Sequence, residues 1–271
     1  MRTRTRQGPH GDSRPRLSDR AKLGTATASA EKSQSSLRGK VALITGASQG
    51  IGLAIAHALA AEGCDLVITG RNQSTLSQAA KQLAKHKTGV RALVCDVRDP
   101  QAVTSLFVAV RREFRHLDLL INNAGVAHAN LKVDELPVEV WKDVIGTNLN
   151  GMFLITRGAL PLMKRGGAIV NNLSIAAKKV FPGSAAYDAS KHGGLALNAT
   201  LREELRVRGI RVIALLPGAT DTAIWNTLWP EAPRKKMMSA KAVAEAVVKV
   251  LTLPAESTVE ELTILPSAGT L

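Results

Sequence analysis

The 271-residue sequence predicts an α/β fold, a single domain in which about seven parallel strands form a doubly wound sheet with helices on both faces. The first observation is a regular alternation of short apolar segments, typical of buried strands, with longer segments of helical periodicity. The second is a glycine-rich turn directly after the first apolar segment. Parallel strands need crossover connections, and these are nearly always right-handed, so the alternation favours a doubly wound sheet.

The elements follow in chain order. Each predicted strand is a short run of apolar and β-branched residues that ends in glycine, proline or a polar residue; the runs are 41–45, 65–69, 91–95, 117–121, 168–173, 210–216 and 259–265. The predicted helices are 51–62, 73–86, 100–115, 137–164, 185–207 and 239–251. The helix 137–164 is expected to bend between Gly146 and Gly151, and Ser239 suits the N-cap of the last helix. Residues 219–238 are expected to be a loop with some helix.

Half of the positive charge lies in the N-terminal segment. Residues 1–40 hold ten basic and three acidic residues, so they contribute +7 of the net +14. Residues 1–37 lack periodic apolar residues and are predicted to be a disordered basic extension, with the folded domain at 38–271. This extension has no aromatic residue, which argues against nucleic-acid binding. A non-functional extension, an organelle transit peptide and an interaction tail remain open for this extension.

Other classes of protein are disfavoured by composition. No apolar run approaches the ~18 residues of a membrane span, so we expect no membrane partner. The two cysteines, Cys64 and Cys95, are too few for a disulfide framework, and no Cys/His cluster has the spacing of a metal site. We therefore expect a protein without a metal, in a reducing compartment such as the cytoplasm.

The glycine-rich turn, Gly46 to Gly52, lies between the first predicted strand and its helix. A doubly wound fold places a phosphate at this helix N-terminus, where glycines let backbone N–H groups approach it closely. At the end of the second predicted strand stands Gly70-Arg71, where NAD-binding versions of this fold carry an acidic residue. An arginine suits a 2′-phosphate, so the sequence favours NADP(H), with NAD(H) possible.

A second group of residues suits acid–base chemistry. Tyr187 and Lys191 are four residues apart on a predicted helix and so share a face. An ammonium beside a phenol should lower the pKa of the phenol from its usual value of about 10. Ser174 closes a predicted strand 13 residues before Tyr187, and its hydroxyl can reach the same small volume. Asn148 lies in the expected helix bend, where freed backbone groups could hold a water.

Taken together and in order, these segments resemble the short-chain dehydrogenase/reductase family, whose fold is of the Rossmann type. The resemblance covers residues 38–271 and rests on motifs found at the family's spacing: Thr45-Gly46 with Gly50-Ile51-Gly52, Asp96-Val97, Asn122-Asn123-Ala124-Gly125, Asn148, Ser174, Tyr187 with Lys191, and Pro217-Gly218. Two positions depart from the family's pattern. Thr220 stands where an aliphatic residue is usual, and Asn172 precedes Leu173 where an apolar residue and a serine are common.

The resemblance implies a role for each of these residues. Tyr187 would be the general acid–base, Ser174 would orient the substrate carbonyl, and Asn148 would hold a water that links Lys191 to solvent. Lys191 would also assist Tyr187 and bind the nicotinamide ribose. The implied cofactor-binding residues are Gly46, Ser48, Gln49, Gly50, Ile51, Gly52, Arg71, Asp96, Val97, Asn123, Ala124, Gly125, Tyr187, Lys191, Pro217, Gly218 and Thr220.

The function that follows is an NADP(H)-dependent oxidoreductase acting on a carbonyl or secondary alcohol. Trp225, Leu228 and Trp229 in the segment 219–238 suggest a hydrophobic or aromatic small-molecule substrate, or else packing within the loop. The alternative is a non-catalytic NADP(H)-sensing regulator with the same fold, which would normally lack Ser174, Tyr187 or Lys191. Members of this family commonly form dimers or tetramers, so the resemblance also implies a homodimer or homotetramer.

Overall fold

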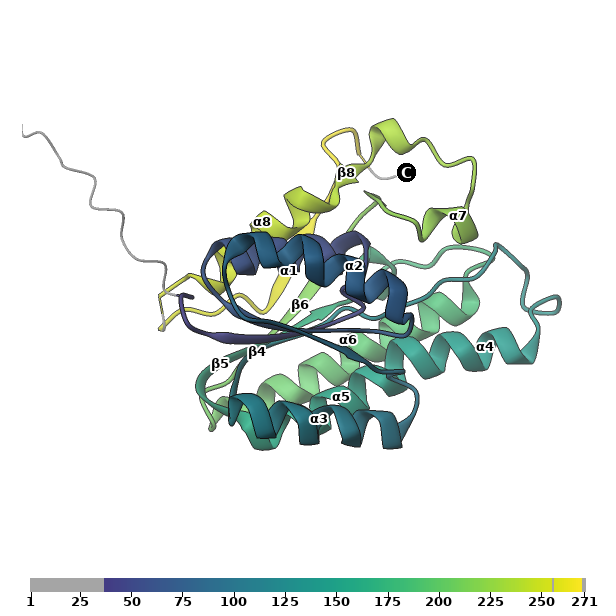
Figure 1. The fold of residues 1–271 in the computed structure, drawn as a ribbon. Helices are drawn as coiled ribbons and strands as arrows, with labels where there is room; N and C mark the ends of the chain where they lie inside the picture. The colour runs from purple at the N-terminus through teal and green to yellow at the C-terminus, as the bar shows by residue number, and fades with distance from the viewer. Residues whose placement is uncertain (1–36, 255, 270–271) are drawn as a thin grey trace, which may run out of the picture. The chain divides into compact units, whose positions relative to one another are not determined.

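Seven parallel strands form one sheet in the computed structural model, which describes residues 37–254 and 256–269 (Figure 1). The strand order is β3-β2-β1-β4-β5-β6-β9. The strands are β1 (Val41–Thr45), β2 (Asp65–Gly70), β3 (Val90–Val94), β4 (Leu117–Asn122), β5 (Met163–Asn172), β6 (Arg211–Pro217) and β9 (Glu261–Ile264). The chain moves outward from β1 to β3 and then returns to the other side of β1, so the order reverses between β1 and β4. The predicted doubly wound sheet is confirmed.

Helices cover both faces of this sheet. Helices α1, α2 and α8 lie over one face, and α3, α5 and α6 lie over the other, as Figure 1 shows. The helices are α1 (Gly50–Ala61), α2 (Gln73–Leu83), α3 (Pro100–Phe114), α4 (Val138–Ile145), α5 (Gly151–Ala159), α6 (Ala185–Arg206), α7 (Trp225–Leu228) and α8 (Ala240–Leu251). None of the helices in the described ranges is long and apolar enough to cross a membrane.

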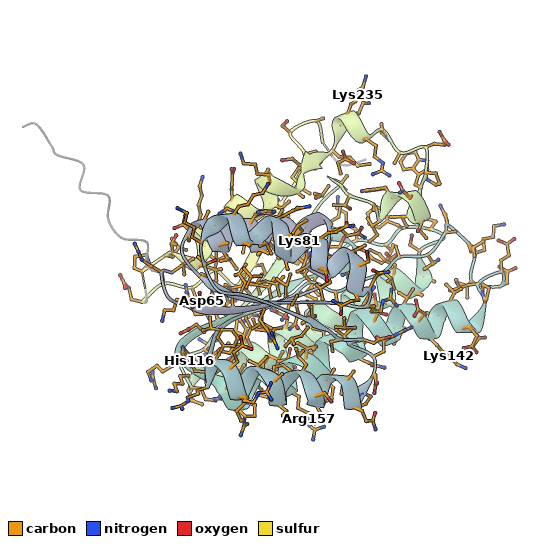
Figure 2. The ribbon with its side chains drawn as sticks, viewed as in Figure 1. Asp65, Lys81, His116, Lys142, Arg157 and Lys235 are labelled. Atoms are coloured by element: carbon orange, nitrogen blue, oxygen red, sulfur yellow. The ribbon has the colours of Figure 1, made fainter. Side chains whose placement is uncertain are left out.

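The alternation of side chains along each strand divides the core into two layers. In β1, Ala42 and Ile44 belong to the apolar cluster beneath α1 and α8, whereas Val41 and Leu43 belong to the cluster beneath α3, α5 and α6. Because both faces are covered, the whole of β1 is buried and its first four residues are apolar, as expected for a strand in a parallel sheet. Charged side chains such as those of Lys81 and Arg157 point away from the layers (Figure 2).

Two predicted elements differ in detail. The bend expected between Gly146 and Gly151 is a π-helical segment, η2 (Gly146–Asn150), between α4 and α5. Strand β5 begins at Met163 instead of residue 168, and its pairing with β4 is irregular between Leu117 and Leu119. The apolar pattern is interrupted there by Lys164, Arg165 and two glycines. The sequence therefore gives no sign that the strand already pairs with β4 at Met163. The predicted extension at residues 1–37 falls, apart from Leu37, outside the described residues.

The segment after β6 has more structure than a loop. Two short strands, β7 (Thr220–Asp221) and β8 (Met238–Ser239), pair in parallel and enclose α7 and the short helix η5 (Arg234–Lys236). Since the carboxyl ends of all seven main strands lie at one edge of the sheet, the residues that follow them gather there. The reversal of strand order between β1 and β4 makes this edge the expected place for a ligand.

Candidate active site

A cavity of about 660 Å³ opens at this edge of the sheet. Sixteen of the residues proposed from the sequence line it: Gly46, Ser48, Gln49, Gly50, Ile51, Arg71, Val97, Asn123, Ala124, Gly125, Ser174, Tyr187, Lys191, Pro217, Gly218 and Thr220. Gly52, Asp96 and Asn148 are not in its lining. The structure therefore brings segments from six strand ends to one cavity, which is large enough for a dinucleotide portion and a small substrate.

The turn from Gly46 to Gly52 is pressed against the end of β4. Gly46 has a φ of +63°, and a Cβ atom there would lie 2.8 Å from Ala124 Cα. A Cβ atom on Gly52 would lie 2.3 Å from Asn123 Nδ2, so Gly52 serves this close packing and not the cavity wall. Gln49, the N-cap of α1, makes no side-chain hydrogen bond to the helix, whose first turn carries no acidic residue. The positive end of α1 is thus available to an anion in the cavity.

Hydrogen bonds that the sequence did not predict fix this arrangement. Thr45 Oγ1 accepts from the backbone N–H groups of Asn123 and Ala124, each at 3.0 Å. The Asn123 amide donates to the carbonyls of Thr45 at 2.9 Å and Gly46 at 3.0 Å. The Asn172 amide in turn donates to Asn123 Oδ1 at 2.8 Å. Thr45 and Asn172 therefore position the glycine turn, and their place at strand ends was the signal that could have revealed them.

Arg71, directly after β2, lines the cavity. Arg71 and Lys191 are the charged residues of the lining, which contains no acidic residue. Asp96 was predicted to contact an adenine, but its carboxylate already accepts a hydrogen bond from Arg98 Nε at 3.0 Å. This guanidinium is the main cause that lowers the pKa of Asp96. Its neighbour Val97 lines the cavity, so the wall there is apolar.

Ser174, Tyr187 and Lys191 line the same cavity. Ser174 follows β5 and caps a single 3₁₀ turn, accepting from Ala176 N–H at 3.1 Å. Tyr187 and Lys191 stand on the first two turns of α6. The Lys191 Nζ lies 5.4 Å from the centroid of the tyrosine ring and donates to the Asn172 carbonyl at 3.2 Å. The Ser174 hydroxyl lies close enough to the phenol to lower the pKa of Tyr187, so the three side chains form one contiguous set.

The sequence predicted that Lys191 lowers the pKa of Tyr187, and this prediction is wrong for the protein without a bound cofactor. Burial raises the pKa of Tyr187 to about 12, while the hydrogen bond with Ser174 lowers it and the charge of Asp188 raises it further. Burial also lowers the pKa of Lys191 to about 8. Removal from water disfavours the charged form of each group, and burial is the largest cause of both shifts. Sequence spacing placed the two side chains together but carried no information on their desolvation.

Asn148 lies behind the cavity, in the middle of the π-helical segment. Its amide donates to the Val126 carbonyl at 2.9 Å and to Ser190 Oγ at 3.0 Å, and its Oδ1 accepts from Val126 N–H at 2.8 Å. The side chain therefore joins the loop after β4 to α6. These contacts occupy both N–H groups of the Asn148 amide and one of the two acceptor sites of its Oδ1.

The remaining wall is apolar and belongs to the segment after β6. Trp225, Leu228 and Trp229 line it, facing a cavity that also contains Ile175 and Phe181. Trp225 Nε1 donates to the Thr220 carbonyl at 2.9 Å, which holds α7 onto β7. The segment is further anchored by Arg234, whose guanidinium donates to Asp221, Asn226 and the Thr222 carbonyl. No group of three or more potential metal ligands occurs within the described part of the chain.

Comparison with known proteins agrees with this architecture. The short chain dehydrogenase family matches residues 40–233. An uncharacterised oxidoreductase of Staphylococcus saprophyticus is 36% identical over 234 residues, which is 85% of this chain and 98% of that protein.

Solved structures of similar proteins show the same fold. An alcohol dehydrogenase from the archaeon Thermococcus sibiricus, complexed with 5-hydroxy-NADP, superposes with a TM-score of 0.80 at 31% identity, over 86% of this chain and 98% of that one. A short chain dehydrogenase from Burkholderia cenocepacia in complex with NADP gives 0.79 at 30% identity, over 86% and 98%. The chain belongs to the short-chain dehydrogenase/reductase family of oxidoreductases.

Proposed function

We propose that the chain is an NADP(H)-dependent carbonyl reductase, or alcohol dehydrogenase in the reverse direction, with Tyr187 as its acid–base. The observation that carries the proposal is the convergence of Ser174, Tyr187 and Lys191 on one cavity with the glycine turn and Arg71. Two related structures contain NADP or a derivative of it, which supports the choice of cofactor. A regulator without turnover would need none of the three polar side chains at this wall.

The cofactor would lie along the edge of the sheet. The N-terminus of α1 and the glycine turn would hold the pyrophosphate, since the first helical turn is free of acidic residues and a side chain at Gly46 would clash with Ala124. The loop from Asn123 to Gly125 would flank the ribose, with Lys191 on its other side. When bound, the nicotinamide exchanges a hydride with the substrate carbon, and its oxidised form adds a positive charge near Tyr187.

Arg71 would select the phosphorylated cofactor. Among the described residues, the Arg71 guanidinium makes no hydrogen bond and no ion pair, although its charge helps to lower the pKa of Asp96. Arg98, in contrast, is bound to both Asp96 and Asp143. A guanidinium without a direct ion pair, in a wall without carboxylates, suits a 2′-phosphate, which it can bind in a bidentate manner.

The proton chemistry follows from the geometry of the three side chains. In the reductive direction, Tyr187 gives its proton to the carbonyl oxygen, while the Ser174 hydroxyl donates a hydrogen bond to that oxygen and holds it in place. Lys191 stabilises the resulting phenolate through its charge. Asn148 joins α6 to the loop after β4 and so keeps Tyr187 and Lys191 in register with the cofactor site.

The substrate would be an uncharged, apolar or aromatic carbonyl compound. Its part of the cavity is formed by Trp225, Leu228, Trp229, Ile175 and Phe181, and contains no charged side chain. A carboxylate or phosphate would be desolvated there without a partner, at a penalty of several kcal/mol. Apolar compounds would gain roughly 25 cal/mol for each Å² that they bury.

We further propose a homo-oligomer in the cytoplasm. Trp141 on α4 and Phe153 on α5 are 40% and 48% exposed, which is unusual for large apolar side chains. Leu201, in contrast, is buried against the sheet. The free, buried Cys64 and Cys95 suit a reducing compartment. Light scattering of the purified protein tests the oligomer, and a single-chain mass would refute it.

The decisive experiment measures NADPH oxidation with a panel of aromatic ketones, aliphatic ketones and keto acids, in wild type and in Tyr187→Phe. We expect turnover with the uncharged compounds and a loss of about 10²-fold or more in the variant, because its ring cannot supply the proton. NADPH binding, followed by its fluorescence, should change by less than about tenfold. Binding without turnover on any compound would favour the sensing regulator, and an active Tyr187→Phe would refute the role of the phenol.

A further inference from the structure

Two uncharged polar side chains on the cavity wall have no part in the proposed reaction. Ser184 is the N-cap residue of α6, and Asn130 lies in the loop after β4; both line the cavity. Among the described residues, neither the Ser184 hydroxyl nor the Asn130 amide makes a hydrogen bond. Polar groups of this kind on an otherwise apolar pocket wall commonly fix the orientation of a ligand.

The Ser184 hydroxyl is available because it does not cap its own helix. A capping serine has extended backbone angles and accepts from the second or third N–H of the helix. Ser184 has a φ of −114° and a ψ of 30°, and its side chain makes no such bond. The residue is only 6% exposed, yet its hydroxyl oxygen is not sealed inside the protein, so the exposed part faces the cavity.

The first turn of α6 favours a neutral oxygen atom at this place. The aligned peptide dipoles of the 22-residue helix give its N-terminal end a partial positive charge, which attracts oxygen atoms of a ligand. Asp188, the acidic residue of the first turn, accepts from the Phe181 N–H at 2.7 Å and does not line the cavity. An anionic ligand would be repelled by this carboxyl group, so a hydroxyl or carbonyl oxygen suits the place better than a carboxylate.

Asn130 is held close to Ser184 by a contact between two loops. The Leu131 N–H donates to the Gly183 carbonyl at 3.0 Å, which ties the loop after β4 to the loop before α6. Gly183 has a φ of +84°, and a Cβ atom there would overlap Asn130 Oδ1, so the amide packs directly onto the Gly183 backbone. Because Gly183 precedes Ser184, the two polar side chains lie on neighbouring parts of one wall. A hydroxyl and an amide each donate and accept, so the pair can bind either a hydroxyl or a carbonyl.

This polar pair lies beside both the proposed acid–base and the apolar wall. Tyr187 follows Ser184 by three residues, and residues at this spacing on a helix have Cβ atoms about 5–6 Å apart. Phe181 and Pro182, just before Ser184, also line the cavity. A compact substrate whose carbonyl lies at Tyr187 can therefore place a second oxygen at the polar pair while its carbon skeleton contacts the apolar wall.

We propose that Ser184 and Asn130 select carbonyl compounds that carry a second uncharged oxygen, a hydroxyl or a carbonyl, near the reacting carbonyl. This inference rests on the proposed function and names its class of substrate more closely. A compound without the second oxygen would cover both polar side chains and leave them without a partner, which lowers its affinity. One neutral hydrogen bond changes a relative affinity by about 3- to 10-fold.

The test compares cyclohexanone with its derivatives that carry a hydroxyl or a methoxy group at carbon 2, 3 or 4. Trp225 and Trp229 line the same cavity, so quenching of tryptophan fluorescence measures the Kd of each compound for the protein saturated with NADP⁺. The value of kcat/KM is measured separately with NADPH. We expect wild type to prefer at least one oxygenated compound over cyclohexanone by about 3- to 10-fold in both measurements.

Ser184→Ala and Asn130→Ala test the two residues separately. Each variant should lower the preference for the oxygenated compound by about 3-fold or more, because one hydrogen bond to the second oxygen is lost. The preference is a ratio of two compounds on the same variant, so a general loss of active protein cancels. Ser105→Ala, at an exposed position of α3, is the matched control and should keep the wild-type preference.

Two results would overturn the inference. One is a wild-type protein that prefers none of the oxygenated compounds over cyclohexanone, and the other is a wild-type preference that survives in either variant. A preference in Kd without turnover of any compound would refute the proposed function alone. Turnover of all compounds without a preference would refute this inference alone, so the two failures are distinguishable.

Discussion

Lys191→Met should stabilise the folded protein at neutral pH while removing activity. The Lys191 side chain is 6% exposed, and burial lowers its pKa from 10.5 to about 8. A shift of about 2.5 units corresponds to roughly 3 kcal/mol by which the folded state disfavours the ammonium. Methionine is unbranched and of similar length, so it can fill the same space without a charge.

The sign of the pH dependence follows from proton binding. Below about pH 8 the lysine is charged in both states, and the full penalty of about 3 kcal/mol applies. Between about pH 8 and 10.5 the unfolded chain binds more protons than the folded one, so stability rises with pH as the penalty disappears. At about pH 9.5, roughly half of the penalty remains. The advantage of Lys191→Met should therefore shrink over this window.

Two interactions of the ammonium reduce the expected gain. Its hydrogen bond to the Asn172 carbonyl and its place over the Tyr187 ring each contribute on the order of 1 kcal/mol. A net stabilisation of about 1 to 2 kcal/mol at pH 7 remains, equivalent to a rise in Tm of a few °C.

Urea unfolding at pH 7 and pH 9.5 measures the effect, with Lys81→Met as the control. Lys81 is exposed on α2, so its replacement should change the free energy of unfolding by less than about 0.5 kcal/mol at either pH. A Lys191→Met protein less stable than wild type at pH 7, or a difference that does not vary with pH, would refute the reasoning that burial dominates at this residue.

Two further changes probe the cofactor side. Arg71→Asp should shift the preference between NADP(H) and NAD(H) toward NAD(H) by at least ~10-fold, because a charge-assisted contact worth about 1.5–3 kcal/mol is lost. The ratio of kcat/KM values for the two cofactors measures the shift, and Arg112→Asp, at an exposed position of α3, is the control. An unchanged ratio would place the 2′-phosphate elsewhere. Gly52→Ala would put a Cβ atom 2.3 Å from Asn123 Nδ2 and should destabilise the fold by about 1–3 kcal/mol in thermal unfolding. Gly146→Ala, whose Cβ would lie 3.7 Å from its nearest neighbour, should be tolerated, and equal stability of both variants would contradict the close packing of the turn.

The sheet was predictable because most of its strands have a clear local sequence pattern. In β1, five consecutive apolar or β-branched residues end at a glycine, and the predicted bounds 41–45 are those observed. Strand β5 was harder to delimit, since Lys164 and Arg165 at its start are exposed and break the apolar pattern. The small sheet of β7 and β8 joins residues 220 and 238, and pairing of such short segments is decided by tertiary contacts that no local pattern records.

The sequence predicted which residues line the candidate site better than it predicted their pKa values. Strand ends gather at one edge of a parallel sheet, so Ser174 and Tyr187 could be placed together before any coordinates existed. The upward shift of the Tyr187 pKa was not foreseeable, because burial is the sum of contacts from many segments. For the same reason the contact of Asp96 with Arg98 was hidden, although only Val97 separates the two residues in the sequence.

A departure from the family's pattern becomes intelligible through hydrogen bonding. Asn172 stands where an apolar residue is common, and its amide donates to Asn123 Oδ1 while its carbonyl accepts from Lys191 Nζ. Asn123 in turn donates to the carbonyls of Thr45 and Gly46. A continuous hydrogen-bonded path therefore runs from the glycine turn after β1, across the ends of β4 and β5, to the lysine on α6. Because the path is buried at Thr45 and Lys191, it fixes the glycine turn relative to the ammonium, and it would hold the proposed cofactor-binding and acid–base parts of the cavity as one unit.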